Sequence, residues 1–193
     1  MFKYLYLTKV EWADTWVKGG DIPISLASTY LHDERDGTLT PDENLIHESE
    51  VDLKSLSPIV RIEDGAQIGS FSMTNCTLNG ERLPDIEDAK FYTEDGVILS
   101  FSNSLSSSIA AKLGKKCCVR VSKLKDLRKL IDKQLGVKGV MKECEYTDDH
   151  QRNHFLKSTE DSWQEEFRIF WKYSSNVTVT IPKGHAKLVA TYD

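Results

Sequence analysis

Two turn dipeptides, Asp64-Gly65 and Asn79-Gly80, constrain the fold of this chain more than any other feature of its sequence. Each is flanked by strand-forming residues in the stretch from Ile59 to Leu83. An Asp-Gly or Asn-Gly pair in that setting is a strong short-range signal for a β-hairpin. We therefore expect two hairpins here, and a further turn at Pro182-Lys183-Gly184 between the last two strands of the chain.

Short runs rich in β-branched and aromatic residues predict the other strands, at 4–8, 21–26, 97–102, 117–121, 137–146, 167–173, 177–181 and 186–191. Helical periodicity predicts helices at 10–18, 104–113 and 123–135, each followed by glycine, and Gly19-Gly20 is expected to end the first with a left-handed C-cap. A further helical turn is expected after Pro41. Because strands do not alternate with helices throughout, a doubly wound parallel sheet is disfavoured. We predict an α+β fold with hairpin-rich, mostly antiparallel sheets and three or four helices.

The helix predicted at 123–135 has the clearest amphipathic pattern. One face carries its apolar residues, Leu124, Leu127, Leu130, Ile131 and Leu135. Lysine and arginine occupy the opposite face, so the apolar face is expected to pack on the core. In the shorter helix at 10–18 the expected apolar face carries Trp12, Ala13, Trp16 and Val17.

Composition places the chain among globular proteins and predicts one domain, residues 1–193. Hydrophobic residues make up 39% and charged residues 28%, with a net charge of -5. Residues 28–57 are polar and acidic, which predicts a loop-rich insertion. Without a basic stretch, nucleic-acid binding is disfavoured. No apolar run of signal-peptide or membrane-spanning length is present, so we expect a cytoplasmic location and no membrane partner.

The cysteines and histidines do not predict a metal site. Cys117 and Cys118 are adjacent, which suits neither a disulfide framework nor a zinc knuckle, and buried free thiols are expected. His150 and His154 are four residues apart, a spacing that could place two imidazoles on one helical face. Their polar surroundings favour a solvated loop instead, and we expect no bound metal.

Two polar groups adjoin predicted strands and could carry chemistry. Serines from Ser100 to Ser108 lie between a strand and a helix, where they cap the helix or present hydroxyl groups to a ligand. Glu166 begins a strand whose Phe167, Ile169 and Trp171 should face the side opposite to Arg168 and Phe170. A carboxylate there can pair with an arginine, or it can stabilise a cationic transition state.

Three segments resemble, in order, the signature regions of ADP-ribosyltransferase-like proteins. The first, residues 5–22, is similar to that family's opening strand, helix and glycine. The second, residues 99–121, resembles its Ser-x-Ser strand, short helix and next strand. The third, Gln164-Glu165-Glu166, matches its Gln-x-Glu element, followed by a final hairpin around 179–184. A W-x-x-E-F-R passage from Trp163 is also similar to one in uncharacterised bacterial and phage-borne proteins.

The resemblance implies a split-sheet fold, NAD as substrate and specific roles for several residues. Glu166 would be the catalytic carboxylate, orienting the ribose hydroxyl and stabilising an oxocarbenium-like state. Gln164 would orient the acceptor. The residues implied in cofactor binding are Tyr6, Thr8, Ser100 and Ser102, and the two serines would position Glu166 and the nicotinamide ribose. Tyr6 stands where the family has a histidine or arginine, and a phenol supplies no positive charge.

Three functional hypotheses follow. In the first hypothesis, the chain is an NAD-dependent ADP-ribosyltransferase-like enzyme, of toxin or phage-conflict type, with a protein acceptor. Alternatively it is a non-catalytic phage or bacterial regulator that binds a protein partner, with the acidic segment from His32 to Glu50 meeting a basic surface. A nuclease or another metal-dependent hydrolase is the third, because scattered aspartates and glutamates do not exclude it.

Overall fold

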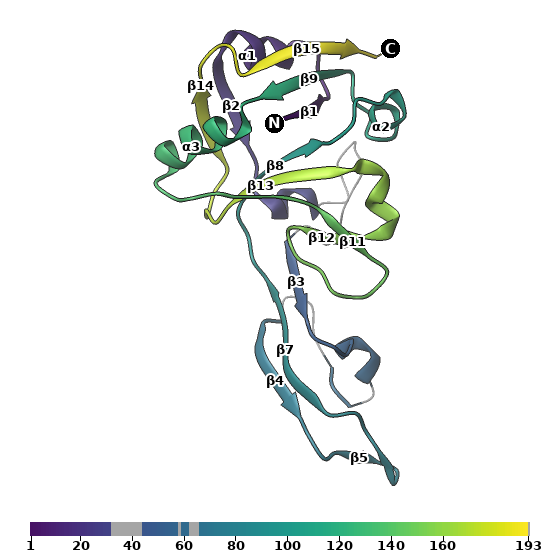
Figure 1. The fold of residues 1–193 in the computed structure, drawn as a ribbon. Helices are drawn as coiled ribbons and strands as arrows, with labels where there is room; N and C mark the ends of the chain where they lie inside the picture. Colours follow the sequence, from purple (N-terminus) through teal and green to yellow (C-terminus); the bar gives the residue numbers. More distant parts are fainter. Residues whose placement is uncertain (32–43, 58, 62–65, 193) are drawn as a thin grey trace.

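The computed structural model describes all residues except 32–43, 58, 62–65 and 193. The chain has an α+β fold with mostly antiparallel sheets, as predicted. The body is built on a six-stranded sheet in the order β10-β13-β8-β1-β9-β15 (Figure 1). These strands are β1 (Phe2–Leu7), β8 (Val97–Ser102), β9 (Cys117–Ser122), β10 (Val140–Glu143), β13 (Glu166–Trp171) and β15 (Ala186–Thr191). Among the described residues, no helix is long and apolar enough to cross a membrane.

One face of this sheet forms the main hydrophobic core. The elements packed on it are α1 (Trp12–Lys18), α3 (Leu124–Leu135), and the pair β2 (Gly20–Ile24) with β14 (Val177–Ile181). Buried residues of α3 include Leu124, Leu127 and Ile131, so the predicted amphipathic helix is confirmed. In β13, Phe167, Ile169 and Trp171 belong to this core. Alternate residues of the same strands point to the opposite face of the sheet.

Shorter elements cover that opposite face. They are α2 (Ser107–Lys112), β11 (Glu145–Thr147), β12 (Leu156–Ser158) and the 3-10 helix η3 (Thr159–Gln164). The Ser106 hydroxyl accepts a hydrogen bond from the Ile109 amide and thus caps α2, as the serine cluster predicted. In β11–β12 the two strands run parallel, in contrast to the antiparallel body sheet.

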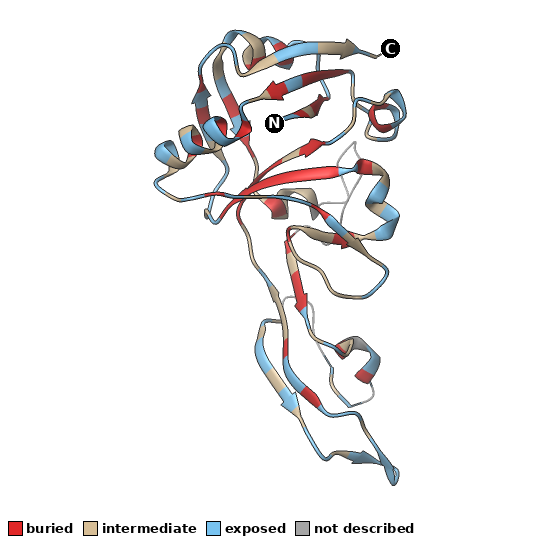
Figure 2. Ribbon diagram, viewed as in Figure 1, coloured by how far each residue is buried: buried red, intermediate tan, exposed pale blue. Residues whose placement is uncertain are grey.

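The described residues within 44–94 form an arm that projects from the body (Figure 1). It holds the sheet β3-β7-β4, made of β3 (Leu45–Glu48), β4 (Ile68–Met73) and β7 (Ile86–Thr93). At its tip, β5 (Thr77–Leu78) and β6 (Glu81–Arg82) form a hairpin. A small apolar cluster stabilises the arm, and it includes Leu53 and Leu56 of the 3-10 helix η2 (Leu53–Leu56). Most arm residues are exposed or half-buried (Figure 2).

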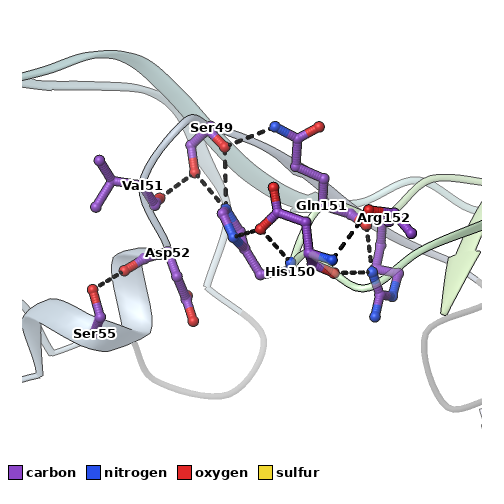
Figure 3. Close-up of polar contacts among 9 residues, drawn as sticks. Ser49, Val51, Asp52, Ser55, His150, Gln151 and Arg152 are labelled. Carbon is purple, nitrogen blue, oxygen red and sulfur yellow. Dashed lines mark hydrogen bonds and ion pairs between the residues drawn. The ribbon is translucent and has the colours of Figure 1, made fainter. Parts of the chain in front are cut away.

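Polar contacts hold the base of the arm against the body (Figure 3). The His47 amide donates to the Arg152 carbonyl at 2.8 Å, and the Arg152 amide donates back at 3.3 Å. The Ser49 carbonyl accepts from Gln151 Nε2 at 3.1 Å and lies 3.1 Å from His150 Nε2. These bonds join β3 and the adjacent Ser49 to the loop after β11. Glu94, at the other end of the arm, lies 2.7 Å from Lys172 Nζ in the body.

The Asn79-Gly80 hairpin is confirmed, whereas Asp64-Gly65 and the turn after Pro41 lie outside the described residues. Residues 28–57 contain β3, η2 and the 3-10 helix η1 (Ala27–Leu31). The hairpin predicted around 182–184 is wrong: β14 pairs with β2, while β15 pairs with β9. The turn therefore connects two different sheets, because each strand finds a partner from a distant part of the chain.

Three local predictions were also wrong. The strand predicted at 137–146 is split into β10 and β11, in different sheets, where the Cys144 amide donates instead to the Glu166 carbonyl at 2.8 Å. Gly19 ends α1 with φ 87° and ψ 159°, which is not left-handed helical. A Cβ at Gly19 would lie 2.7 Å from the Lys183 amide nitrogen. The close approach of these two backbone segments explains why a glycine occupies this position. Trp12 is 47% exposed rather than packed on the core.

We expect Gly139→Ala to lower the free energy of unfolding by about 1–3 kcal/mol. A Cβ at this position would lie 2.4 Å from Trp171 Nε1, and Trp171 is fully buried and cannot move without repacking the core. Urea denaturation measures the change. Gly69→Ala is the control, because no atom lies within 4 Å of its added Cβ. Equal stabilities of the two variants would contradict the prediction.

Candidate functional site

The strands of the first two resembling segments and the last residue of the third, Glu166, meet in the body sheet, where β13, β8 and β1 are neighbours. Their registers place Glu166 opposite Ser102, Arg168 opposite Ser100, and Ser102 opposite Tyr4. Leu5, Leu99 and Phe167 point into the main core. The alternate residues therefore share the other face, and we name it the Glu166 face: Tyr4, Tyr6, Ser100, Ser102, Glu166 and Arg168.

Glu166 is buried and lies between two buried cations. Its Oε2 atom lies 3.0 Å from Lys157 Nζ and 2.9 Å from Arg168 Nη2. Ser100, opposite Arg168 on the neighbouring strand β8, also helps to lower the pKa of this carboxylate. The Glu166 amide donates to the Tyr146 hydroxyl at 2.8 Å. The side chain is thus held by ion pairs with residues of two strands, Lys157 of β12 and Arg168 of β13.

These neighbours keep the Glu166 carboxylate ionised. Burial by itself would raise its pKa, but the guanidinium of Arg168 and the ammonium of Lys157 outweigh that effect. Together they lower the pKa from 4.5 to about 2. For the adjacent phenol of Tyr146, burial raises the pKa to about 12, so it stays neutral.

Gln164, the predicted acceptor-orienting residue, is part of the same network. Its Oε1 accepts from Lys157 Nζ at 3.0 Å, and its Nε2 donates to Asp161 Oδ1 at 2.9 Å. Asp161 Oδ2 in turn lies 3.3 Å from Lys157 Nζ. Lys157 therefore links both residues for which the resemblance implies catalytic roles, and its ammonium is surrounded by three acceptors.

Tyr6 is on the Glu166 face but binds the loop that follows β8. Its hydroxyl donates to the Ser104 carbonyl at 2.8 Å and accepts from the Ser106 amide at 2.7 Å. Burial raises the pKa of Tyr6 to about 12. The phenol thus fixes the loop between the Ser-x-Ser strand and α2.

Two other predicted residues have different surroundings. Ser102 is buried, and its hydroxyl accepts from the Ser104 amide at 3.2 Å. Thr8 is exposed beyond the end of β1, and its hydroxyl accepts from Lys115 Nζ at 3.1 Å. Ser102 therefore lies beside the Glu166 network, whereas Thr8 binds outside it.

The Glu166 face is largely closed to solvent. Lys112 of α2 lies over the ring of Trp163 of η3, with its Nζ 4.9 Å from the ring centroid, so the two covering elements touch. Surface cavities of about 350 Å³ and 490 Å³ lie near Lys172, the first at the base of the arm. Neither is lined by Tyr6, Ser100, Ser102 or Glu166.

The sequence analysis missed three members of the network: Lys157, Asp161 and Tyr146. Lys157 and Asp161 are four residues apart, but they lie in β12 and η3, so the helical spacing rule does not predict their ion pair. No local signal connects Tyr146 to Glu166, since they meet only because β11 crosses the end of β13. Arg168 was placed on the correct face by strand alternation.

His150 and His154 have separate roles in the structure. His150 contacts Ser49 at the base of the arm, as described above. His154 is buried, not solvated as predicted, and stacks on Phe170 with ring centroids 3.9 Å apart. Within the described residues, no group of three or more His, Cys, Asp or Glu side chains is arranged to hold a metal ion. Cys117 and Cys118 are buried free thiols, as predicted.

Comparisons with protein-family models, with curated proteins and with solved structures gave no match.

Proposed function

We propose that this chain is an ADP-ribosyltransferase-like protein that uses NAD, with Glu166 as its catalytic carboxylate. The observation that supports the proposal best is that Ser100 and Ser102 lie on the same face of the sheet as the ionised Glu166, where they can position it. Serine and glutamate belong to segments more than sixty residues apart, and the resemblance implied this positioning role for the serine. Ser102 and Tyr6 share the same face of the sheet, from β8 and β1.

In the proposed reaction the bond between the nicotinamide nitrogen and ribose C1′ breaks, and its electron pair leaves with nicotinamide. The negative charge of Glu166 stabilises the cationic ribose, because preorganised charges act strongly in a site that excludes water. An acceptor nucleophile then forms a bond to C1′ and releases its proton. Lys157 and Arg168 both contact Oε2 of Glu166, so Oε1 can accept hydrogen bonds from hydroxyl groups.

Tyr6 has a different role in this proposal from the histidine or arginine of the family. Its hydroxyl is bound to backbone groups of Ser104 and Ser106. We assign it to positioning the loop beside Ser102, not to binding a phosphate. NAD would enter between α2 and η3, which requires the contact of Lys112 with Trp163 to open.

The test is an NAD titration that measures both melting temperature and nicotinamide release. We expect the melting temperature of the wild type to rise by about 5–10 °C at NAD a hundredfold above its dissociation constant. Ser100→Ala should lower nicotinamide release at least tenfold, because the proposal gives the Ser100 hydroxyl a role in positioning Glu166. Ser122→Ala is the matched control, because the Ser122 hydroxyl, at the last residue of β9, donates to the His185 carbonyl.

Two outcomes would overturn the proposal. One is the absence of any shift in wild-type melting temperature at millimolar NAD. The other is equal nicotinamide release by Ser100→Ala and Ser122→Ala.

A further inference from the structure

The outer edge of β4, in the arm, differs in charge from the two edges of the body sheet. In the order β3-β7-β4, β4 is a terminal strand and pairs with β7 alone among the described strands. Its sequence, Ile68 to Met73, contains no charged residue and no proline. An edge strand leaves a row of backbone donors and acceptors unpaired, which makes it a template for pairing with another chain.

The edges of the body sheet carry the usual protection against such pairing. Strand β10 contains Lys142 and Glu143, and β15 contains Lys187 together with an irregular register after Leu188. Charged residues and bulges are the common ways in which proteins prevent edge pairing. Strand β4 has register irregularities toward β7 but no charge of its own.

The side chains of β4 suit an extended partner. Gly69, Ser70 and Ser72 are exposed, while Phe71 and Met73 are half-buried against the apolar cluster of the arm. A partner strand would therefore meet small polar groups on one face of the sheet and the rim of an apolar cluster on the other. This alternation is what specific strand addition uses.

The net charge of the arm indicates which kind of partner would bind there. Residues 44–94 contain ten acidic and four basic residues, an excess of six negative charges, whereas the whole chain has a net charge of -5. The arm therefore carries the net negative charge of the protein. Two such arms repel each other, which disfavours a second copy of this chain and favours a basic partner.

We propose that the free edge of β4 binds an extended, positively charged segment of another protein, which adds a fourth strand to the arm sheet. Backbone hydrogen bonds to residues 68–73 hold the segment, and the net negative charge of the arm attracts its lysine or arginine residues. The proposal does not depend on the NAD chemistry of the body.

Gly69 offers a clean test of this edge. An added Cβ would have no atom within 4 Å, so larger residues fit there without strain. Gly69→Lys adds to β4 the kind of charge that protects β10 and β15, and it repels a basic segment. Gly69→Thr adds a side chain of β-favouring shape without charge and serves as the matched control.

The probe is a fluorescent peptide of alternating threonine and valine with two lysines at each end, measured by fluorescence anisotropy with the full-length protein. We expect saturable binding that weakens at least tenfold in Gly69→Lys and changes less than twofold in Gly69→Thr. Bound peptide should slow amide hydrogen exchange in residues 68–73. Binding should also weaken when salt rises from about 0.05 M to about 0.5 M.

Three results would overturn the proposal. The first is equal binding of a peptide with glutamates in place of the lysines. The second is equal peptide binding by Gly69→Lys and wild type, or no protection of residues 68–73. The third is a dimer in sedimentation experiments that Gly69→Lys dissociates, since the edge would then be covered by a second copy.

Discussion

Glu166→Gln is expected to lower the free energy of unfolding by about 3–5 kcal/mol, because it leaves two buried cations without their shared carboxylate. Lys157 and Arg168 are 2% and 0% exposed and both contact Glu166 Oε2. Glutamine has almost the same shape, so the loss comes from charge and not from packing. Chemical denaturation measures the effect. Glu165→Gln, at the exposed neighbouring position, should change stability by less than about 0.5 kcal/mol.

The double variant Glu166→Gln with Lys157→Met separates electrostatics from other causes. Removing one buried cation together with the carboxylate should recover part of the lost stability, since the two groups are coupled. No recovery in the double variant would show that the ion pair is not the reason for the loss.

The single variant Glu166→Gln should also differ from wild type in how its stability depends on pH. The pKa of Glu166 is lowered from 4.5 to about 2 in the folded protein, so its ionised form stabilises the fold at pH values above 4.5. This contribution is lost as the pH falls from 4.5 toward 2. Wild type should therefore lose more stability over that window than Glu166→Gln. Parallel pH profiles of the two proteins would contradict the assignment.

Trp171→Ala is expected to have an effect of similar size, about 3–5 kcal/mol. Trp171 is fully buried in β13, and its Nε1 donates to Asp132 Oδ1 at 2.7 Å. The substitution removes a large apolar surface from the main core and leaves Asp132 of α3 without this donor. We expect a lower urea midpoint and weaker protection of α3 in hydrogen exchange.

Trp12→Ala is the matched control, because the same change is made on an exposed side chain. Trp12 is 47% exposed at the start of α1, with the Lys9 ammonium 5.6 Å from its ring centroid. It should lose less than about 1 kcal/mol, the size of an exposed cation–π contact. Similar losses in the two tryptophan variants would contradict the burial difference between them.

Local signals determined much of the architecture. The apolar face of α3, the Asn79-Gly80 hairpin and the serine cap of α2 each depend on residues a few positions apart, so the sequence alone predicts them. Strand alternation likewise placed Phe167 and Arg168 on opposite faces of β13. The α+β class followed from the same short-range patterns.

Only the tertiary structure decided which strands pair and which side chains share a site. The turn at 182–184 looked like a hairpin, yet β14 and β15 joined different sheets, because pairing depends on partners distant in the chain. Lys157 reached Glu166 through the packing of β12 and η3 on the sheet, and Trp12 stayed exposed while Trp171 was buried. Periodicity determines which face of an element is apolar, whereas contacts between distant segments determine what covers that face.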